Sequence, residues 1–103
     1  MAAQFRAEET FPGTRDQIGT ACVAALRECR FKVTDWDMVQ GWVRARAPFG
    51  LRSWGENITV MVRPDGTVEI VSECRLATQM LDWGKNKANV TTLFSRLRSA
   101  LGA

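Results

Sequence analysis

The sequence predicts one α+β domain over residues 1–103, in which five antiparallel strands form a sheet and two helices cover one of its faces. Five stretches alternate in polarity, as half-buried strands do, and two carry apolar residues at the three- and four-residue spacing of an amphipathic helix. The expected order is β-α-β-β-β-β-α. At 103 residues and 46% hydrophobic residues, the chain is long and apolar enough to bury one core.

The first strand and the first helix have clear limits in the sequence. Residues 5–11 alternate in polarity and stop at Pro12-Gly13. Thr14, with Gln17 three residues later, forms a capping-box pattern that predicts a helix start, and Asp16 favours the same end. The apolar stripe then predicts a helix of about four turns; its members are Ile18, Ala21, Cys22, Ala25, Leu26 and Cys29.

Four more strands and a final helix complete the fold. The strands are expected at residues 31–36, 42–47, 58–63 and 68–74, with a turn over 37–41 and a hairpin turn at Pro64-Asp65-Gly66. A last helix starts between Trp83 and Lys87 and carries an apolar stripe from Val90 to Leu101. The order resembles half of the TATA-binding protein and the helix-grip folds, an analogy of architecture that implies no function.

Composition argues against several classes of function. The chain has no His, which removes the usual general base and metal ligand. Cys22, Cys29 and Cys74 are odd in number and match no zinc spacing, so we expect small buried side chains and no metal or cofactor. The N-terminal residues lack the features of a signal peptide, and no stretch approaches the roughly 18 apolar residues of a membrane span. We expect a cytoplasmic protein with no membrane partner.

Two predicted loops combine large apolar residues with polar ones, and we expect a cleft between them. The loop over 49–56 contains Phe49 and Trp54, and the segment over 75–89 contains Trp83. Such residues either close the core or line a binding site. Gly84-Lys85 does not complete a phosphate-binding loop. Two interpretations remain open for the start of the last helix. One is an anion site formed by Arg75, Lys85 and Lys87. The other is a polar cap in which Asp82, Asn86 and Asn89 hold the chain through hydrogen bonds.

The uncovered face of the sheet is the second candidate surface. Alternation places Trp42, Arg44, Arg46 and Arg63 on it, which suits stacking and contacts with single-stranded nucleic acid. Glu69 and Glu73 share the face, however, and would pair with these arginines, so a nucleic-acid partner is not favoured. The same face carries Met61 and Val71, and it is the expected surface for a homodimer.

The segment after the last strand is similar to a family of uncharacterised bacterial proteins. The similarity rests on Ser72-Glu73-Cys74-Arg75, Thr78, Asp82-Trp83-Gly84-Lys85-Asn86 and the apolar helix from Val90. Members of that family have a Ser-x-Ser-Arg strand, an Asp-x-Gly-x-Asn element and a C-terminal helix. The resemblance covers about a quarter of the chain and implies no activity, but it indicates which residues to examine.

We expect a non-enzymatic module that binds a small ligand or a protein between the 49–56 and 75–89 loops. The alternatives are nucleic-acid binding through the open sheet face and an enzyme built on carboxylates, for which Glu56, Glu69, Glu73 and Asp82 are the candidates. The predicted binding residues are Trp54, Arg75, Asp82, Trp83, Gly84, Lys85 and Asn86.

Overall fold

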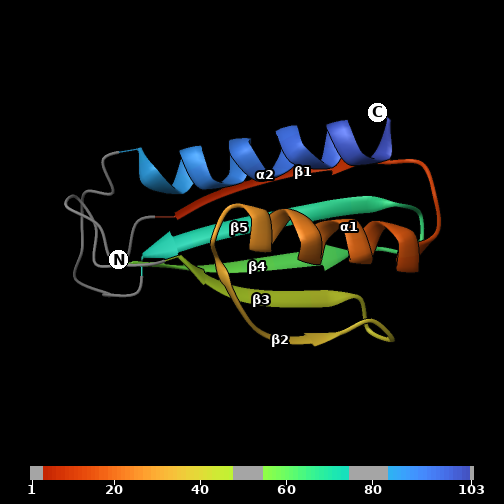
Figure 1. Ribbon diagram of the computed structural model, residues 1–103, viewed down its shortest axis with the longest axis horizontal. Helices are drawn as coiled ribbons and strands as arrows, with labels where there is room; N and C mark the ends of the chain where they lie inside the picture. The colour runs from red at the N-terminus through yellow and green to blue at the C-terminus, as the bar shows by residue number, and fades with distance from the viewer. Residues whose placement is uncertain (1–3, 48–54, 75–83, 103) are drawn as a thin grey trace.

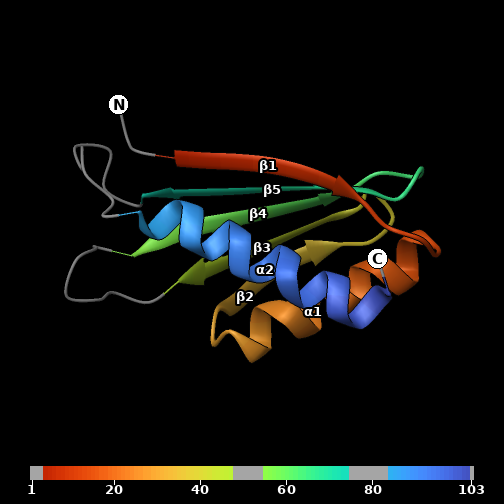
Figure 2. The same cartoon turned by 90° about the horizontal axis from the view of Figure 1, so that it is seen from above.

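The computed structural model describes residues 4–47, 55–74 and 84–102. They form one five-stranded antiparallel sheet in the order β1-β5-β4-β3-β2, with two helices on one face (Figures 1 and 2). The elements are β1 (Gln4–Thr10), α1 (Arg15–Glu28), β2 (Lys32–Asp37), β3 (Trp42–Ala47), β4 (Glu56–Val62), β5 (Thr67–Cys74) and α2 (Lys85–Leu101). The predicted α+β class and element order are confirmed.

The strands from β2 to β5 are neighbours in chain order, whereas β1 pairs with β5 at the far edge. The connection from β1 to β2 therefore crosses the whole sheet, and α1 lies along this crossing (Figure 1). Helix α1 contacts β2, β3 and β4, and α2 contacts β1 and β5. The two helices together thus cover one face from edge to edge.

The start of α1 agrees with the capping box seen in the sequence. Thr14 has an extended backbone, its side chain accepts from the amide of Gln17 at 3.2 Å, and the Gln17 side chain accepts from the amide of Thr14 at 2.9 Å. Two backbone N–H groups that the first turn cannot bond are satisfied in this way.

Replacing Thr14 by Ala is expected to lower the free energy of unfolding by about 1 kcal/mol, because the amide of Gln17 loses its acceptor. Chemical denaturation of the purified protein measures this loss. Thr14→Ser keeps the hydroxyl group and should stay within about 0.5 kcal/mol of the wild type. A Ser variant as unstable as the Ala variant would show that the methyl group, and not the cap, provides the stability.

One hydrophobic core lies between the sheet and the two helices. Ile18 and Leu26 of α1 and Leu93 and Leu97 of α2 are at most 1% exposed, and they pack onto the inward side chains of the central strands. Phe11, just after β1, stacks on Phe94 with 6.2 Å between ring centroids. Each fully buried side chain of this size contributes roughly 1.5–3 kcal/mol through burial.

The hairpin between β4 and β5 confirms the predicted turn. Gly66 has φ +89°, and an added Cβ would lie 2.5 Å from the carbonyl oxygen of Phe11. Asp65 accepts from the amide of Thr67 at 2.9 Å, and this bond lowers the pKa of the Asp65 carboxyl group. The position therefore requires glycine both for its backbone conformation and for the close approach of the chain after β1.

The predicted boundaries differ from the structure by one or two residues at four strands, and β1 and β5 each begin one residue earlier than expected. β2 runs one residue later than expected and contains an irregularity between Val33 and Asp35. β4 begins at Glu56, two residues before the expected strand, and ends at Val62. The earlier start matters for the site, because it moves Glu56 from a loop into the sheet.

Candidate ligand-binding site

Five polar or weakly polar side chains are buried together where β4 begins, β5 ends and α2 begins. We call them the polar cluster: Glu56 on β4, Ser72 and Cys74 on β5, and Asn86 and Asn89 on α2. Glu56, Ser72 and Asn86 are 0% exposed, and the other two are 4% exposed. Buried polar groups are costly unless they bond to one another, so a group of this size indicates a specific arrangement.

The strand register explains how the two strands contribute. Glu56 pairs with Cys74, and Ser72 pairs with Ile58 two residues further along. Since side chains alternate along a strand, Glu56 points to the helix-covered face like Ile58 and Val60. The chain therefore extends its inward row with a carboxyl group at the end of the sheet.

Helix α2 provides the other two groups by helical spacing. Asn86 and Asn89 are three residues apart and share a face with Val90 and Leu93, so they extend the apolar stripe of the helix into its first turn. Gly84, with φ +73°, precedes the helix and provides no side-chain cap. The first turn of α2 is thus held to the sheet by the polar cluster.

Hydrogen bonds connect most of the cluster. The Asn89 amide donates to Glu56 Oε1 at 3.0 Å and to Ser72 Oγ at 3.2 Å. Ser72 Oγ in turn donates to Asn86 Oδ1 at 2.8 Å, and Asn86 Nδ2 lies 3.5 Å from Cys74 Sγ. A chain of this kind orders each side chain through its neighbour.

One atom of the cluster has no partner. Glu56 Oε2 is buried and accepts no hydrogen bond from any residue within 4–47, 55–74 and 84–102. Leaving a buried acceptor unpaired costs roughly 1–3 kcal/mol, and more for a charged group. A buried carboxylate oxygen in this state has the chemistry to accept a bond from a ligand.

The structure describes three of the seven sequence-predicted binding residues. Asn86 belongs to the polar cluster, whereas Gly84 and Lys85 are exposed at the start of α2. Lys87 is likewise exposed. Trp54, Arg75, Asp82 and Trp83 lie outside the described residues, as does most of the expected cleft.

The sequence patterns place Ser72 in the family resemblance and Asn89 in a polar cap, but they predict neither as a binding residue and treat Glu56 as a loop carboxylate. A signal for Glu56 was present, because it stands two residues before Ile58 in the same alternation. A signal for Asn89 was also present, because it lies one residue before the apolar stripe that starts at Val90. The burial of both was not predicted, since polar residues are normally assigned to solvent.

Of the other three carboxylates considered for catalysis, Asp82 lies outside the described residues and the remaining two lie on the opposite face of the sheet. Glu69 and Glu73 alternate with the inward residues of β5, so neither can form a carboxylate pair with Glu56. No group of three or more His, Cys, Asp or Glu residues suited to a metal occurs in the part of the chain that the structure describes. Burial raises the pKa of the Cys22 thiol to about 12, which keeps it protonated and unreactive at neutral pH.

On the open sheet face, three of the four residues considered for nucleic-acid binding already have contacts within the chain: Arg63, Arg44 and Trp42. Arg63 forms ion pairs with Glu8 at 3.2 Å and with Glu69 at 3.8 Å. The guanidinium group of Arg44 lies 4.9 Å from the ring centroid of Trp42. The expected pairing of Glu69 with an arginine is therefore present.

A hollow of about 690 Å³ lies on the outer surface near both helices and includes Glu28, Thr91 and Arg96. Arg96 and Glu28 form an exposed ion pair there, with 3.5 Å between Arg96 Nη1 and Glu28 Oε1. The hollow includes none of the predicted site residues. It therefore offers less specific chemistry than the polar cluster. Within the described ranges, no helix is long and apolar enough to cross a membrane.

Comparison with known protein families gives no matching family, and comparison with curated proteins gives no match. The similarity to the bacterial family with the Asp-x-Gly-x-Asn element therefore stays a prediction.

Proposed function

We propose that this protein is a non-enzymatic binding module whose ligand presents a cationic nitrogen, such as a guanidinium or ammonium group, to Glu56. The single observation that supports it most is the unpartnered, fully buried Oε2 of Glu56. Carboxylates bind such groups through short, charge-assisted hydrogen bonds. A ligand of this kind would provide the donor that the described residues do not.

The surroundings of Glu56 support recognition rather than catalysis. Its other oxygen accepts from Asn89, whose amide is itself held by Ser72, so the carboxyl group has a fixed orientation. A fixed acceptor suits selective binding, because little side-chain freedom is lost when the ligand arrives. General acid–base chemistry would need a second titratable group beside it, and the described inward face offers none within the cluster apart from the Cys74 thiol.

The two loops predicted to bind a ligand are connected in sequence to members of the polar cluster. Gly55 directly precedes Glu56, and Arg75 directly follows Cys74. Residues 48–54 and 75–83, which contain Trp54 and Trp83, are continuous in sequence with these ends of the cluster. The binding role of these tryptophans, and of the Asp82–Asn86 segment, belongs to the same proposal.

A cytoplasmic location is also part of the proposal. It is supported by the three cysteines, all within the described ranges, which form no disulfide.

Replacing Glu56 by Gln tests the proposal, because the variant keeps the shape and the acceptor for Asn89 but removes the charge. Agmatine, arginine methyl ester and putrescine are suitable probes, with their effect on the melting temperature followed by calorimetry. We expect at least one probe to raise the melting temperature of the wild type. In Glu56→Gln the same probe should bind about tenfold more weakly or worse.

The unliganded Glu56→Gln protein should be about 1–2 kcal/mol more stable than the wild type, because the fold no longer buries a charge. Glu28→Gln, an exposed carboxylate on α1, is the matched control and should leave probe binding unchanged. The proposal fails if no cationic probe affects the wild type, or if the probes affect the wild type and Glu56→Gln equally.

Nucleic-acid binding through Trp42, Arg44, Arg46 and Arg63 has less support. Arg63 is shared between two carboxylates, and the remaining basic groups stand beside Glu73 and Asp35 on the same face. An enzyme based on Glu56, Glu69, Glu73 and Asp82 has still less, because the three described carboxylates lie on two different faces of the sheet.

A further inference from the structure

Two neighbouring rows of side chains on the open face of the sheet carry charges that are complementary to themselves. None of the described helices covers this face (Figure 2). At its centre β4 presents Met61, which is 40% exposed, together with Thr59 and Asn57. Trp42 on β3 and Val71 on β5 lie on either side and are partly exposed. An apolar strip with charged borders is the usual composition of a protein interface.

The strand register fixes where the charges stand. One row across the sheet places Arg46 on β3, Asn57 on β4 and Glu73 on β5 side by side. The next row runs across all five strands, and its members are Asp35, Arg44, Thr59, Val71 and Arg6. In the first row Arg46 and Glu73 lie one strand away from β4 on opposite sides. In the second row Asp35 and Arg6 lie two strands away from β4 on opposite sides.

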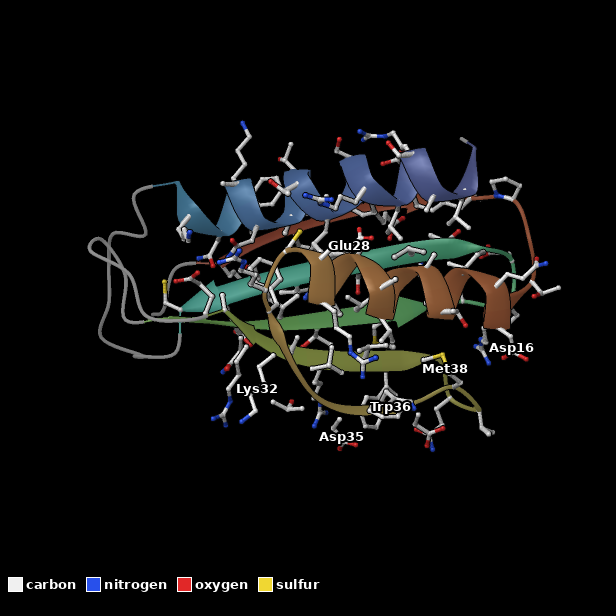
Figure 3. All side chains as sticks on the ribbon, in the orientation of Figure 1. Asp16, Glu28, Lys32, Asp35, Trp36 and Met38 are labelled. Carbon is white, nitrogen blue, oxygen red and sulfur yellow. The ribbon has the colours of Figure 1, made fainter. Side chains whose placement is uncertain are left out.

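These four border charges have no ion-pair partner inside the described chain. Arg6, Asp35, Arg46 and Glu73 are absent from the ion pairs that form between described residues, which involve Arg63, Arg96 and Arg98 instead. Among the described residues, Asp35 accepts a hydrogen bond from the backbone amide of Trp36 alone, and it lies on the edge strand β2 (Figure 3). The four side chains are therefore available to a partner that brings the opposite charge.

We infer that this face binds a second copy of the chain, with the two-fold axis parallel to β4 and between the two sheets. This axis places β3 opposite β5 of the second copy, and β2 opposite β1 of the second copy. Because the axis runs along the strands, each row of side chains lies opposite the same row of the second copy. Arg46 then faces Glu73 of the second copy, and Asp35 faces Arg6 of the second copy. Symmetry repeats both pairs, which gives four ion pairs in the rows of Asn57 and Thr59, and the two Met61 side chains meet in the next row.

The same charges argue against the other in-plane axis. An axis perpendicular to the strands would place each strand opposite itself in the reverse direction. Arg44 would then face Arg44 of the second copy, and Glu69 would face Glu73 of the second copy. Like charges in contact cost free energy. The axis along β4 also brings one like-charged pair together, because Asp37 and Glu8 share the row of Met61, but its four opposite-charge contacts outnumber the two like-charge contacts that symmetry generates. The balance of charges therefore favours the axis along β4.

The size of the face predicts a weak dimer. Five strands of six to eight residues span roughly 20 by 23 Å, or about 450 Å² of sheet per copy, which is below the usual area of a stable interface. We therefore expect a dissociation constant of roughly 10–100 µM. Exposed ion pairs weaken as salt rises, so the constant should increase between about 50 mM and 500 mM NaCl.

Sedimentation velocity on the full chain, from a few micromolar to several hundred micromolar, measures this equilibrium. Arg46→Glu and Glu73→Arg should each raise the dissociation constant at least about tenfold, because each places like charges in contact. The double variant Arg46→Glu/Glu73→Arg exchanges the charges and should restore dimerisation. Met61→Arg, at the axis, should leave a monomer.

Lys87→Glu is the matched control, because it makes the same charge change on α2, away from the sheet face, and should dimerise like the wild type. Circular dichroism confirms that each variant is folded. A wild type that stays monomeric at every concentration overturns the inference, as does a double variant that fails to recover. A labelled single-stranded oligonucleotide is added in a parallel series; if the wild type binds it through Arg46 while remaining monomeric, the face serves nucleic acid and the inference is wrong.

Discussion

Replacing Gly41 by Ala is expected to lower the free energy of unfolding by about 3 kcal/mol or more, one of the two largest effects that we predict for a single substitution. Gly41 lies between β2 and β3 with φ +81°, where an alanine costs roughly 1–2 kcal/mol. An added Cβ would also overlap the carbonyl oxygen of Val62 and lie 2.9 Å from Arg15 Nε. Both neighbours would have to move.

The contacts around Gly41 explain why that movement is costly. The amide of Val62 donates to the Gly41 carbonyl at 2.6 Å, and the side chain of Arg15 donates to the Val62 carbonyl at 3.0 Å. Arg15 also donates to the carbonyl of Val39 at 2.9 Å. The glycine therefore lies where the first turn of α1, the β2–β3 turn and the end of β4 meet.

Gly102→Ala separates the two causes of the loss. Gly102 has φ +73°, but nothing lies within 4 Å of an added Cβ. This control should lose only the conformational part, about 1–2 kcal/mol, in chemical denaturation. Equal losses in the two variants would show that crowding at Gly41 contributes nothing.

Replacing Asn89 by Ala should lower the free energy of unfolding by about 3 kcal/mol. The substitution removes the donor to Glu56 Oε1 and leaves both carboxyl oxygens without a partner among the described residues. Leaving a buried acceptor without a partner costs about 1–3 kcal/mol, and more when the acceptor is charged, whereas the other acceptor of Asn89, Ser72, keeps its bond to Asn86. Urea unfolding at a concentration where the chain is monomeric measures the loss.

A double-mutant cycle with Glu56→Gln shows whether the carboxyl group is responsible. In the Gln background, Asn89→Ala should cost only about 1–2 kcal/mol, because no charge is left unpaired. Asn57→Ala, which truncates an exposed asparagine on β4, should change stability by less than about 0.5 kcal/mol. If Asn89→Ala costs the same with Glu56 and with Gln, the bond to the carboxyl group contributes no stability of its own.

Local patterns of the sequence were sufficient for the elements of the fold. The capping box at Thr14 and the turn at Gly66 predicted one helix start and one hairpin, because each depends on the conformations of only a few residues. The apolar stripes predicted both helices for a similar reason. These local patterns do not predict the pairing of β1 with β5, because that pairing depends on packing between distant parts of the chain.

The polar cluster was harder to predict, since its members are polar residues in positions normally filled by apolar ones. Glu56 continues the inward row of Ile58, and Asn86 and Asn89 continue the stripe of Val90, yet each reads as solvent-facing when taken alone. Only the register between Glu56 and Cys74 shows that the end of β4 and the start of α2 share one buried space. Asn86 was predicted from the family resemblance, without its burial.

The position of β1 has a consequence for how the chain is made. Gln4 pairs with Glu73, a residue that the ribosome adds 69 positions later. At about 5–20 residues per second, the first strand waits roughly 3–14 seconds for its partner to be synthesised, while the hairpins from β2 to β5 can form in sequence. Its half-buried Phe5 and Ala7 stay accessible to water during that time. Within this sheet β1 therefore cannot pair until β5 has been synthesised, and we expect its unpaired edge to be accessible to chaperones and to misassembly until then.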